Sequence, residues 1–178
     1  MSKINRNSMA FIDKFGVEYS DDKRTIVGCP LDFEGEYNIP HGVTNIGACA
    51  FWGCKNLTSV VIPNSVSDIE DNAFCGCENL ASISIPSSVI RIGEGAFESC
   101  KNLTHVVIRD GIKSIGKNAF GDCINLKTIT LPSSITDIWH STFSGCENLE
   151  KITIPKGSKE YFLKFVAFAF IHHLIVEE

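Results

Sequence analysis

The sequence predicts a repeat solenoid, a mostly β chain wound into stacked coils with irregular or short helical turns. The first observation is a period: the pair that begins at Ile39-Pro40 returns every 23 residues, and such self-similarity is typical of stacked repeats. The second is a strand-like alternation of apolar residues before each such pair. The third is composition, because 44% hydrophobic and 21% charged residues are typical of a globular chain. We therefore expect residues 1–178 to form a single solenoid domain with a sizeable core.

Five copies of the 23-residue unit occupy residues 39–154. In the second copy Leu80, Ile83 and then Ile85 alternate inward along a strand, which ends at Pro86 because proline has no N–H for a ladder. An apolar pair three residues apart predicts a second short strand on another side of each coil, and an Ala-Phe pair supplies the bulk of the interior. The copies begin at Ile39-Pro40, Ile62-Pro63, Ile85-Pro86, Ile108-Arg109 and Leu131-Pro132, and Ile154-Pro155 follows the last one.

Two polar columns recur with the unit. Parallel coils lie about 4.8 Å apart, whereas a disulfide needs Cβ atoms about 3.8 Å apart, so we interpret the cysteine column as reduced, buried thiols. A disulfide among Cys29, Cys49 and Cys75 stays open. The asparagine column is expected to bond backbone groups of a buried turn in the neighbouring coil. The columns are Cys54, Cys77, Cys100, Cys123 and Cys146, and Asn56, Asn79, Asn102, Asn125 and Asn148.

The two ends of the chain predict caps, because the first and last core layers of a solenoid are otherwise open. Residues 1–38 are expected to form an N-terminal cap with a β-hairpin, since the β-rich runs 17–19 and 25–27 flank a polar turn. Residues 155–178 are expected to form a C-terminal cap. There an apolar stripe predicts a helix over 161–170, and a short strand follows at 172–176.

This pattern resembles the BspA-like leucine-rich-repeat family, whose unit runs I-P-x-S-V-x-x-I-x-x-x-A-F-x-x-C-x-N-L-x-x-V-x. The match covers residues 39–154 at nearly every consensus position, and the departures are Arg109 for Pro, Trp139 for Gly and Thr142 for Ala. The resemblance implies a right-handed solenoid with a parallel sheet along one side. It also implies a bacterial protein, often secreted or at the cell surface, with adhesion or host-protein binding in some members. No catalytic residues come with it.

Charge and hydropathy exclude several classes of partner. A net charge of -5 argues against nucleic acid, whose phosphates need clustered Lys and Arg. The longest apolar run, 165–171, is too short for a membrane span of roughly 20 residues. Residues 1–10 lack the apolar segment of a secretory signal. The expected location is therefore cytoplasmic for the chain as written, or secreted or at the cell surface if a signal was removed.

The candidate reactive groups lack partners. His172 and His173 are adjacent, so a strand would point them to opposite faces and they could not hold one metal ion. The Cys75-Gly-Cys77 sequence has no second pair of zinc ligands, and buried thiols are poor nucleophiles. We therefore expect no cofactor, no metal site and no enzyme activity.

Function is expected where the copies differ, on the outward positions of the repeated strand. A flat ribbon of small polar residues with exposed valines favours a binding scaffold for another protein, or for a glycan, although Ser and Thr also suit a solvated strand. Two alternatives stay open: a thiol-dependent enzyme or redox protein using Cys75 or a surface cysteine with a histidine, and self-association through the aromatic C-terminal segment. We expect a monomer. The candidate partner-binding residues are Ser59, Val61, Ser82, Ser84, His105, Val107, Thr128, Thr130, Lys151 and Thr153.

Overall fold

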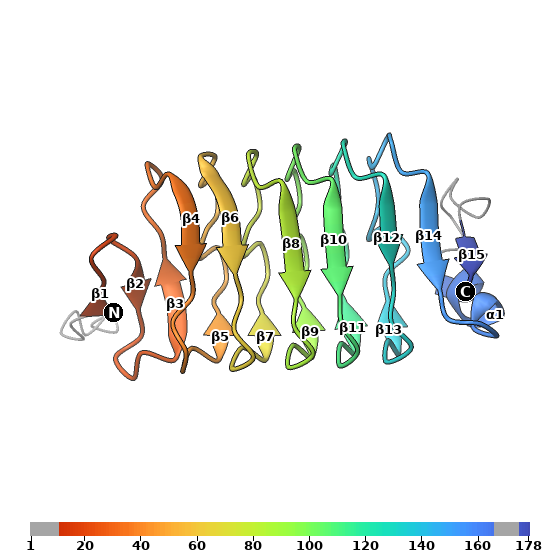
Figure 1. Cartoon of the computed structure of the whole chain (residues 1–178), viewed down its shortest axis with the longest axis horizontal. Helices are drawn as coiled ribbons and strands as arrows, with labels where there is room; N and C mark the ends of the chain where they lie inside the picture. Colours follow the sequence, from red (N-terminus) through yellow and green to blue (C-terminus); the bar gives the residue numbers. More distant parts are fainter. Residues whose placement is uncertain (1–10, 166–174) are drawn as a thin grey trace, which may run out of the picture.

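The computed structural model describes residues 11–165 and 175–178, which form a β-solenoid of about 6 turns (Figure 1). Each coil carries a longer strand on one side, here called the long-strand side, and its two sides are joined by turns. The long strands follow one another along the axis of the solenoid (Figure 1). They are β4 (Gly35–Asn38), β6 (Leu57–Val61), β8 (Ser82–Ile85), β10 (His105–Ile108), β12 (Thr128–Thr130) and β14 (Lys151–Ile154).

The other side of the coils, the short-strand side, forms an eight-stranded sheet in the order β1-β2-β3-β5-β7-β9-β11-β13. From β3 onward its neighbours pair in parallel. From β5 onward residues 23 apart face each other, as Ile46, Ile69 and Ile92 do. The prediction of a second short strand in each coil is confirmed. Its strands after the N-terminal hairpin are β5 (Asn45–Ile46), β7 (Asp68–Ile69), β9 (Arg91–Ile92), β11 (Ser114–Ile115) and β13 (Asp137–Ile138).

The ladder on the long-strand side is interrupted once. Strands β8, β10, β12, β14 and β15 form one parallel sheet, whereas β4 and β6 form a separate pair. Strands β6 and β8 are neighbours along the axis (Figure 1), and two backbone hydrogen bonds join the chain near their N-terminal ends. Asn79 N–H donates to the Lys55 carbonyl at 3.1 Å, and Ala81 N–H donates to the Thr58 carbonyl at 3.4 Å.

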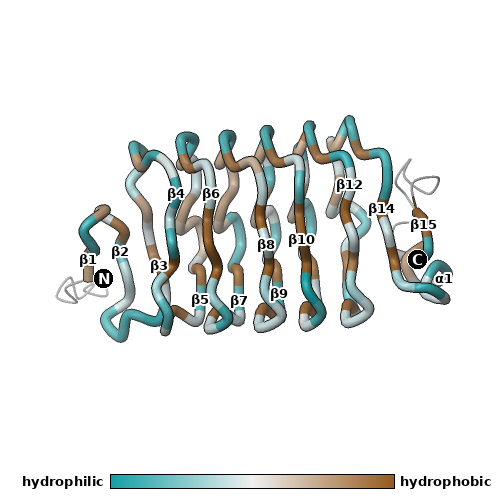
Figure 2. The backbone as a smooth tube through the Cα atoms, in the orientation of Figure 1, coloured by the Kyte–Doolittle hydropathy of each residue, from teal (hydrophilic) through white to brown (hydrophobic). Residues whose placement is uncertain are grey.

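The core is built from columns of equivalent residues, and Figure 2 shows hydrophobic residues recurring in coil after coil. The phenylalanine of each copy is buried and stacks on its counterpart in the next coil. Ring centroids lie 4.9 Å apart for Phe51 and Phe74, 5.2 Å for Phe74 and Phe97, and 5.3 Å for Phe97 and Phe120. The planes of these pairs differ by 10° or less, so the stack runs along the solenoid axis.

The cysteine column is reduced, and all eight cysteines are free. Each column thiol donates to a carbonyl of the preceding coil: Cys77 to Phe51 at 3.1 Å, and Cys100 to Phe74 at 3.3 Å. Burial raises the pKa of Cys77 and Cys100, and it raises the pKa of the half-buried Cys146 to about 12. The interpretation of this column as reduced, buried thiols is confirmed for Cys54, Cys77, Cys100 and Cys123. Cys54 differs from the others in its pKa, which a hydrogen bond with Cys29 lowers.

Two members of the asparagine column, Asn125 and Asn148, bond the backbone of the preceding coil as predicted, but the turn that carries the column is not buried. Asn125 donates from Nδ2 to the Lys101 carbonyl at 2.8 Å, and Asn148 donates to the Ile124 carbonyl at 2.7 Å. Asn102 donates instead to the side chain of Asn79 at 3.1 Å, and both residues are exposed. The column occupies an outer corner of the coil, so its side chains reach the neighbouring turn from the solvent side.

The N-terminal part continues the solenoid. Strand β2 (Glu18–Tyr19) pairs antiparallel with β3 (Thr25–Gly28), which is the predicted hairpin, and β1 (Phe11–Ile12) pairs antiparallel with β2. Strand β4 within the expected cap was not predicted. Its buried Tyr37, followed by buried Ile39, matches the inward alternation of the later copies, but Gly35 and Asn38 are weak strand formers.

The C-terminal part contains α1 (Lys159–Phe165), so the helix starts two residues earlier than predicted. The rest of the predicted helix, 166–170, lies outside the described residues, as do positions 172–174 of the predicted strand. Strand β15 (Ile175–Glu177) pairs in parallel with β14, and Phe162 and Ile175 are buried. No helix in the described ranges is long and apolar enough to cross a membrane.

Candidate binding surface on the long-strand side

The ten outward residues predicted from the sequence lie on the long strands, and we call them the long-strand strip. Inward neighbours such as Val60, Ile83 and Val106 are buried, so the strip faces away from the core. Val61 and Val107 are 49% and 52% exposed, whereas Ser59, Lys151 and Thr153 are half-buried. The exposed polar members are Ser82, Ser84, His105, Thr128 and Thr130.

Strand register brings the strip into two rows. In the first row Ser82 faces His105, His105 faces Thr128, and Thr128 faces Lys151. In the second row Val107 lies between Ser84 and Thr130. The β6 members, Ser59 and Val61, belong to the neighbouring sheet, so the interrupted ladder separates them from the rest.

A cavity of about 450 Å³ opens on this side beside β6 and β8, and we call it the β6/β8 hollow. Its walls come from the trailing ends of both strands and from the turns that follow them. At that end Pro63 and Pro86 have no N–H to continue a ladder. The lining residues are Val60, Val61, Ile62, Asn64, Ser84, Pro86, Ser87 and Arg109.

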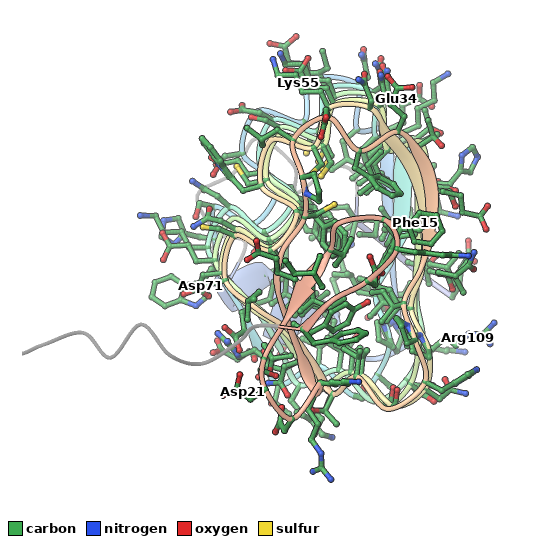
Figure 3. The ribbon with its side chains drawn as sticks, turned by 90° about the vertical axis from the view of Figure 1, so that its left-hand side faces the viewer. Phe15, Asp21, Glu34, Lys55, Asp71 and Arg109 are labelled. Atoms are coloured by element: carbon green, nitrogen blue, oxygen red, sulfur yellow. The ribbon has the colours of Figure 1, made fainter. Side chains whose placement is uncertain are left out.

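Arg109 reaches the hollow from the fourth copy. Its N–H donates to the Ile85 carbonyl at 3.1 Å, a bond that the proline of the other copies cannot make. Because side chains alternate along a strand, Arg109 follows His105 and Val107 on the outward side. Figure 3 shows Arg109 on the side of the coil opposite Asp71. From the sequence, Arg109 was noted only as a departure from Pro. Its spacing of two residues from Val107 would have placed it on the outward side of the strand.

The strip has a charge unlike that of the whole chain. Its ten residues include no Asp or Glu, although the chain has 21 of them, and Arg109 adds a cation beside the strip. The Lys151 ammonium group contacts the Glu178 carboxylate. Strand β4, next to β6, carries one carboxylate, Glu36. From β6 to β14 the long-strand side is therefore rich in hydroxyl groups and weakly cationic.

The short-strand side holds many of the acidic groups. There Arg91 bridges Asp68 at 3.1 Å and Asp71 at 3.2 Å, and Lys117 pairs with Glu94 at 3.7 Å. A second cavity of about 320 Å³ lies among these residues. One of its lining residues is Trp139, which is 50% exposed and occupies the position that Gly47, Gly93 and Gly116 have in other copies. The sequence had marked Trp139 only as a departure from Gly.

Comparison with family models adds the decisive observation. The model described as "BspA type Leucine rich repeat region" matches residues 34–150 and 92–174, with six copies. This chain belongs to the BspA-type leucine-rich-repeat family. Comparison with curated proteins found no match.

Solved structures of bacterial leucine-rich-repeat proteins are similar to this chain. A leucine-rich cell surface protein from Faecalibacterium prausnitzii is 34% identical over 86% of the chain, with a TM-score of 0.78. A leucine-rich repeat protein from Eubacterium ventriosum is 26% identical over 82%, with a TM-score of 0.76. The T. pallidum leucine-rich repeat protein is 28% identical over 78%, with a TM-score of 0.70. The chain spans 41% of each of the first two proteins and 68% of the third.

Among the thiols of this BspA-type protein, Cys75 was the candidate nucleophile. It is half-buried, and burial raises the pKa of its thiol, with a further contribution from the nearby Glu98 carboxylate. A raised pKa lowers the fraction of thiolate at neutral pH, whereas catalytic cysteines have a lowered pKa. This environment therefore disfavours Cys75 as the nucleophile of a thiol-dependent enzyme.

Proposed function

We propose that this BspA-type protein is a non-enzymatic scaffold that binds another protein through the long-strand strip. The observation that carries the proposal is the regular strip itself, with Val61 and Val107 about half exposed among small hydroxyl side chains. Small outward side chains let a partner approach the sheet closely, and covering apolar area stabilises a complex by about 25 cal/mol per Å². Proteins of the leucine-rich-repeat families are typical binding scaffolds, which supports the same proposal.

The setting of this activity is part of the proposal. The similar F. prausnitzii protein is described as a cell surface protein, which favours a secreted or surface location and a role in adhesion or host-protein binding. A glycan is the second class of partner, because the hydroxyl groups of Ser82, Ser84, Thr128 and Thr130 both donate and accept hydrogen bonds. The scaffold is proposed to act as a monomer.

The test uses a phage-displayed library of random twelve-residue peptides, selected on the immobilised full chain. Peptides that bind are measured by fluorescence anisotropy against Thr130→Arg, which places a long side chain in the middle of the strip. The control is Ser144→Arg, a matched change at an exposed position outside the strip. We expect Thr130→Arg to weaken binding at least tenfold and Ser144→Arg to leave it unchanged. Equal binding to both variants would contradict the proposal.

A further inference from the structure

We infer that the β6/β8 hollow binds a side-chain carboxylate on an extended acidic segment of a partner protein, with Arg109 as its anchor. The inference rests on the proposed function, because the hollow opens within the long-strand side. It adds the chemistry of the partner and names a residue outside the ten of the strip.

The polar groups of the hollow suit an anion. The Arg109 guanidinium offers N–H donors in a planar fork that matches both oxygens of a carboxylate. The Ser84 and Ser87 hydroxyls and the Asn64 amide can each donate a further hydrogen bond. Among the lining residues that the structure describes, none carries a carboxylate, and Arg109 makes no ion pair within residues 11–165 and 175–178.

The remaining walls are apolar and favour a carboxylate carried on an aliphatic stem. Val60, Val61, Ile62 and Pro86 line the hollow beside these donors. Covering such walls removes water, and a charge pair is stronger where less water surrounds it. A volume of about 450 Å³ is within the range of ligand pockets, so the hollow has room for a Glu or Asp side chain with adjoining backbone.

Charge complementarity selects an acidic segment over a basic one. Arg109 directly follows β10 and brings a positive charge to the hollow, whereas the Lys151 ammonium group already contacts Glu178. The ten strip residues include no Asp or Glu, although the chain as a whole carries a charge of -5. A Lys or Arg side chain in the hollow would meet the Arg109 guanidinium as a like charge. The interrupted ladder shapes the site, because continuous pairing of β6 with β8 would close the space between their trailing ends.

The experiment compares three substitutions in the full chain. Arg109→Gln removes the charge at similar size, Arg109→Pro restores the residue of the other copies, and Arg109→Lys keeps the charge but not the planar fork. Lys117→Gln on the short-strand side is the control for a lost positive charge. Thermal unfolding of each variant checks that the solenoid is intact. The probes are peptides from the library selection above, each synthesised also with its Glu and Asp residues replaced by Gln and Asn.

We expect the selected peptides to be enriched in Glu and Asp and to lose roughly 3- to 30-fold in affinity on neutralisation. Arg109→Gln and Arg109→Pro should abolish this preference, Arg109→Lys should retain part of it, and Lys117→Gln should leave it unchanged. Raising the salt concentration should weaken the acidic peptides more than the neutral ones.

Other outcomes separate the two proposals. Two outcomes would show that the carboxylate site is wrong while the scaffold proposal stands. In the first, the selected peptides lose affinity for the Thr130→Arg variant but are not acidic. In the second, they bind the Arg109→Gln variant and the unmodified chain with equal affinity. If Thr130→Arg has no effect, or selection yields no binding peptide, both are wrong. A sialylated trisaccharide is tested as a competitor. If the trisaccharide displaces the bound peptides at a lower concentration than an unlabelled acidic peptide does, the hollow binds an acidic glycan and the proposed peptide segment is wrong.

Discussion

The column thiols connect single residues to the stability of the whole solenoid. Cys77, Cys100 and Cys123 are fully buried, and burial raises the pKa of each thiol above its usual value of 9.0. In the unfolded chain these thiols ionise near that usual value, whereas in the folded chain they stay protonated. Their contribution to stability is therefore complete below pH 9 and is lost as the pH rises further.

The free energy of unfolding should accordingly fall above pH 9, with a slope of about 1.4 kcal/mol per pH unit for each buried thiol. Urea unfolding at pH 7.5, 9.5 and 10.5 measures this slope. Cys100→Ala serves as the comparison, because it removes one thiol while other alkaline titrations stay. Its slope should be shallower by the contribution of one proton, and identical slopes would contradict the assignment.

At the residue scale the sequence predicted which repeated residues are buried, but not the role of residues that depart from the repeat. The repeat pattern correctly made Cys100 a buried thiol, because packing follows from the period alone. The same pattern marked Arg109 and Trp139 as departures without giving them a role. Their surroundings depend on which residues of neighbouring coils reach them, and that is set by the stacking of coils rather than by spacing within one copy.

The phenylalanine stack is the principal element of the core. Phe97 lies between Phe74 and Phe120, with ring centroids 5.2 Å and 5.3 Å away, and it is fully buried. Phe97→Ala should lower the free energy of unfolding by about 3–5 kcal/mol, because it removes both ring contacts of Phe97 and leaves a cavity in the stack. Urea unfolding measures the loss. Phe11→Ala, in the exposed strand β1, should cost less than about 1 kcal/mol.

Equal losses for the two variants would show that the stack contributes no more than surface packing.

At the scale of the elements, the sequence predicted both strand types, because the alternation of apolar residues and the apolar pair recur in each copy. It did not predict β4, where Gly35 and Asn38 weaken the signal. Nor could it predict the interruption between β6 and β8, because both strands have the same residue pattern and differ only in how their backbones meet.

The C-terminal part affects the stability and association of the whole molecule, because α1 and β15 lie at the end of the last coil. Truncation after Ile154 removes the buried Phe162 and Ile175 and exposes Ile152 and Ile154 at the open end. We expect the intact chain to be a monomer of 19.5 kDa by light scattering and the truncated chain to unfold at lower temperature. An intact chain that is oligomeric, and a truncated chain that is a stable monomer, would favour self-association through this segment instead.

The pairing of residues 23 apart has a consequence for how such a protein changes in size. An in-frame deletion of residues 85–107 would join Ser84 directly to Ile108 and place Phe74 next to Phe120, which are already equivalent in the stack. The rod would shorten by one coil, about 4.8 Å, while both ends kept their own packing. Reach can therefore change in fixed steps by gain or loss of whole copies, independently of the side chains that choose the partner.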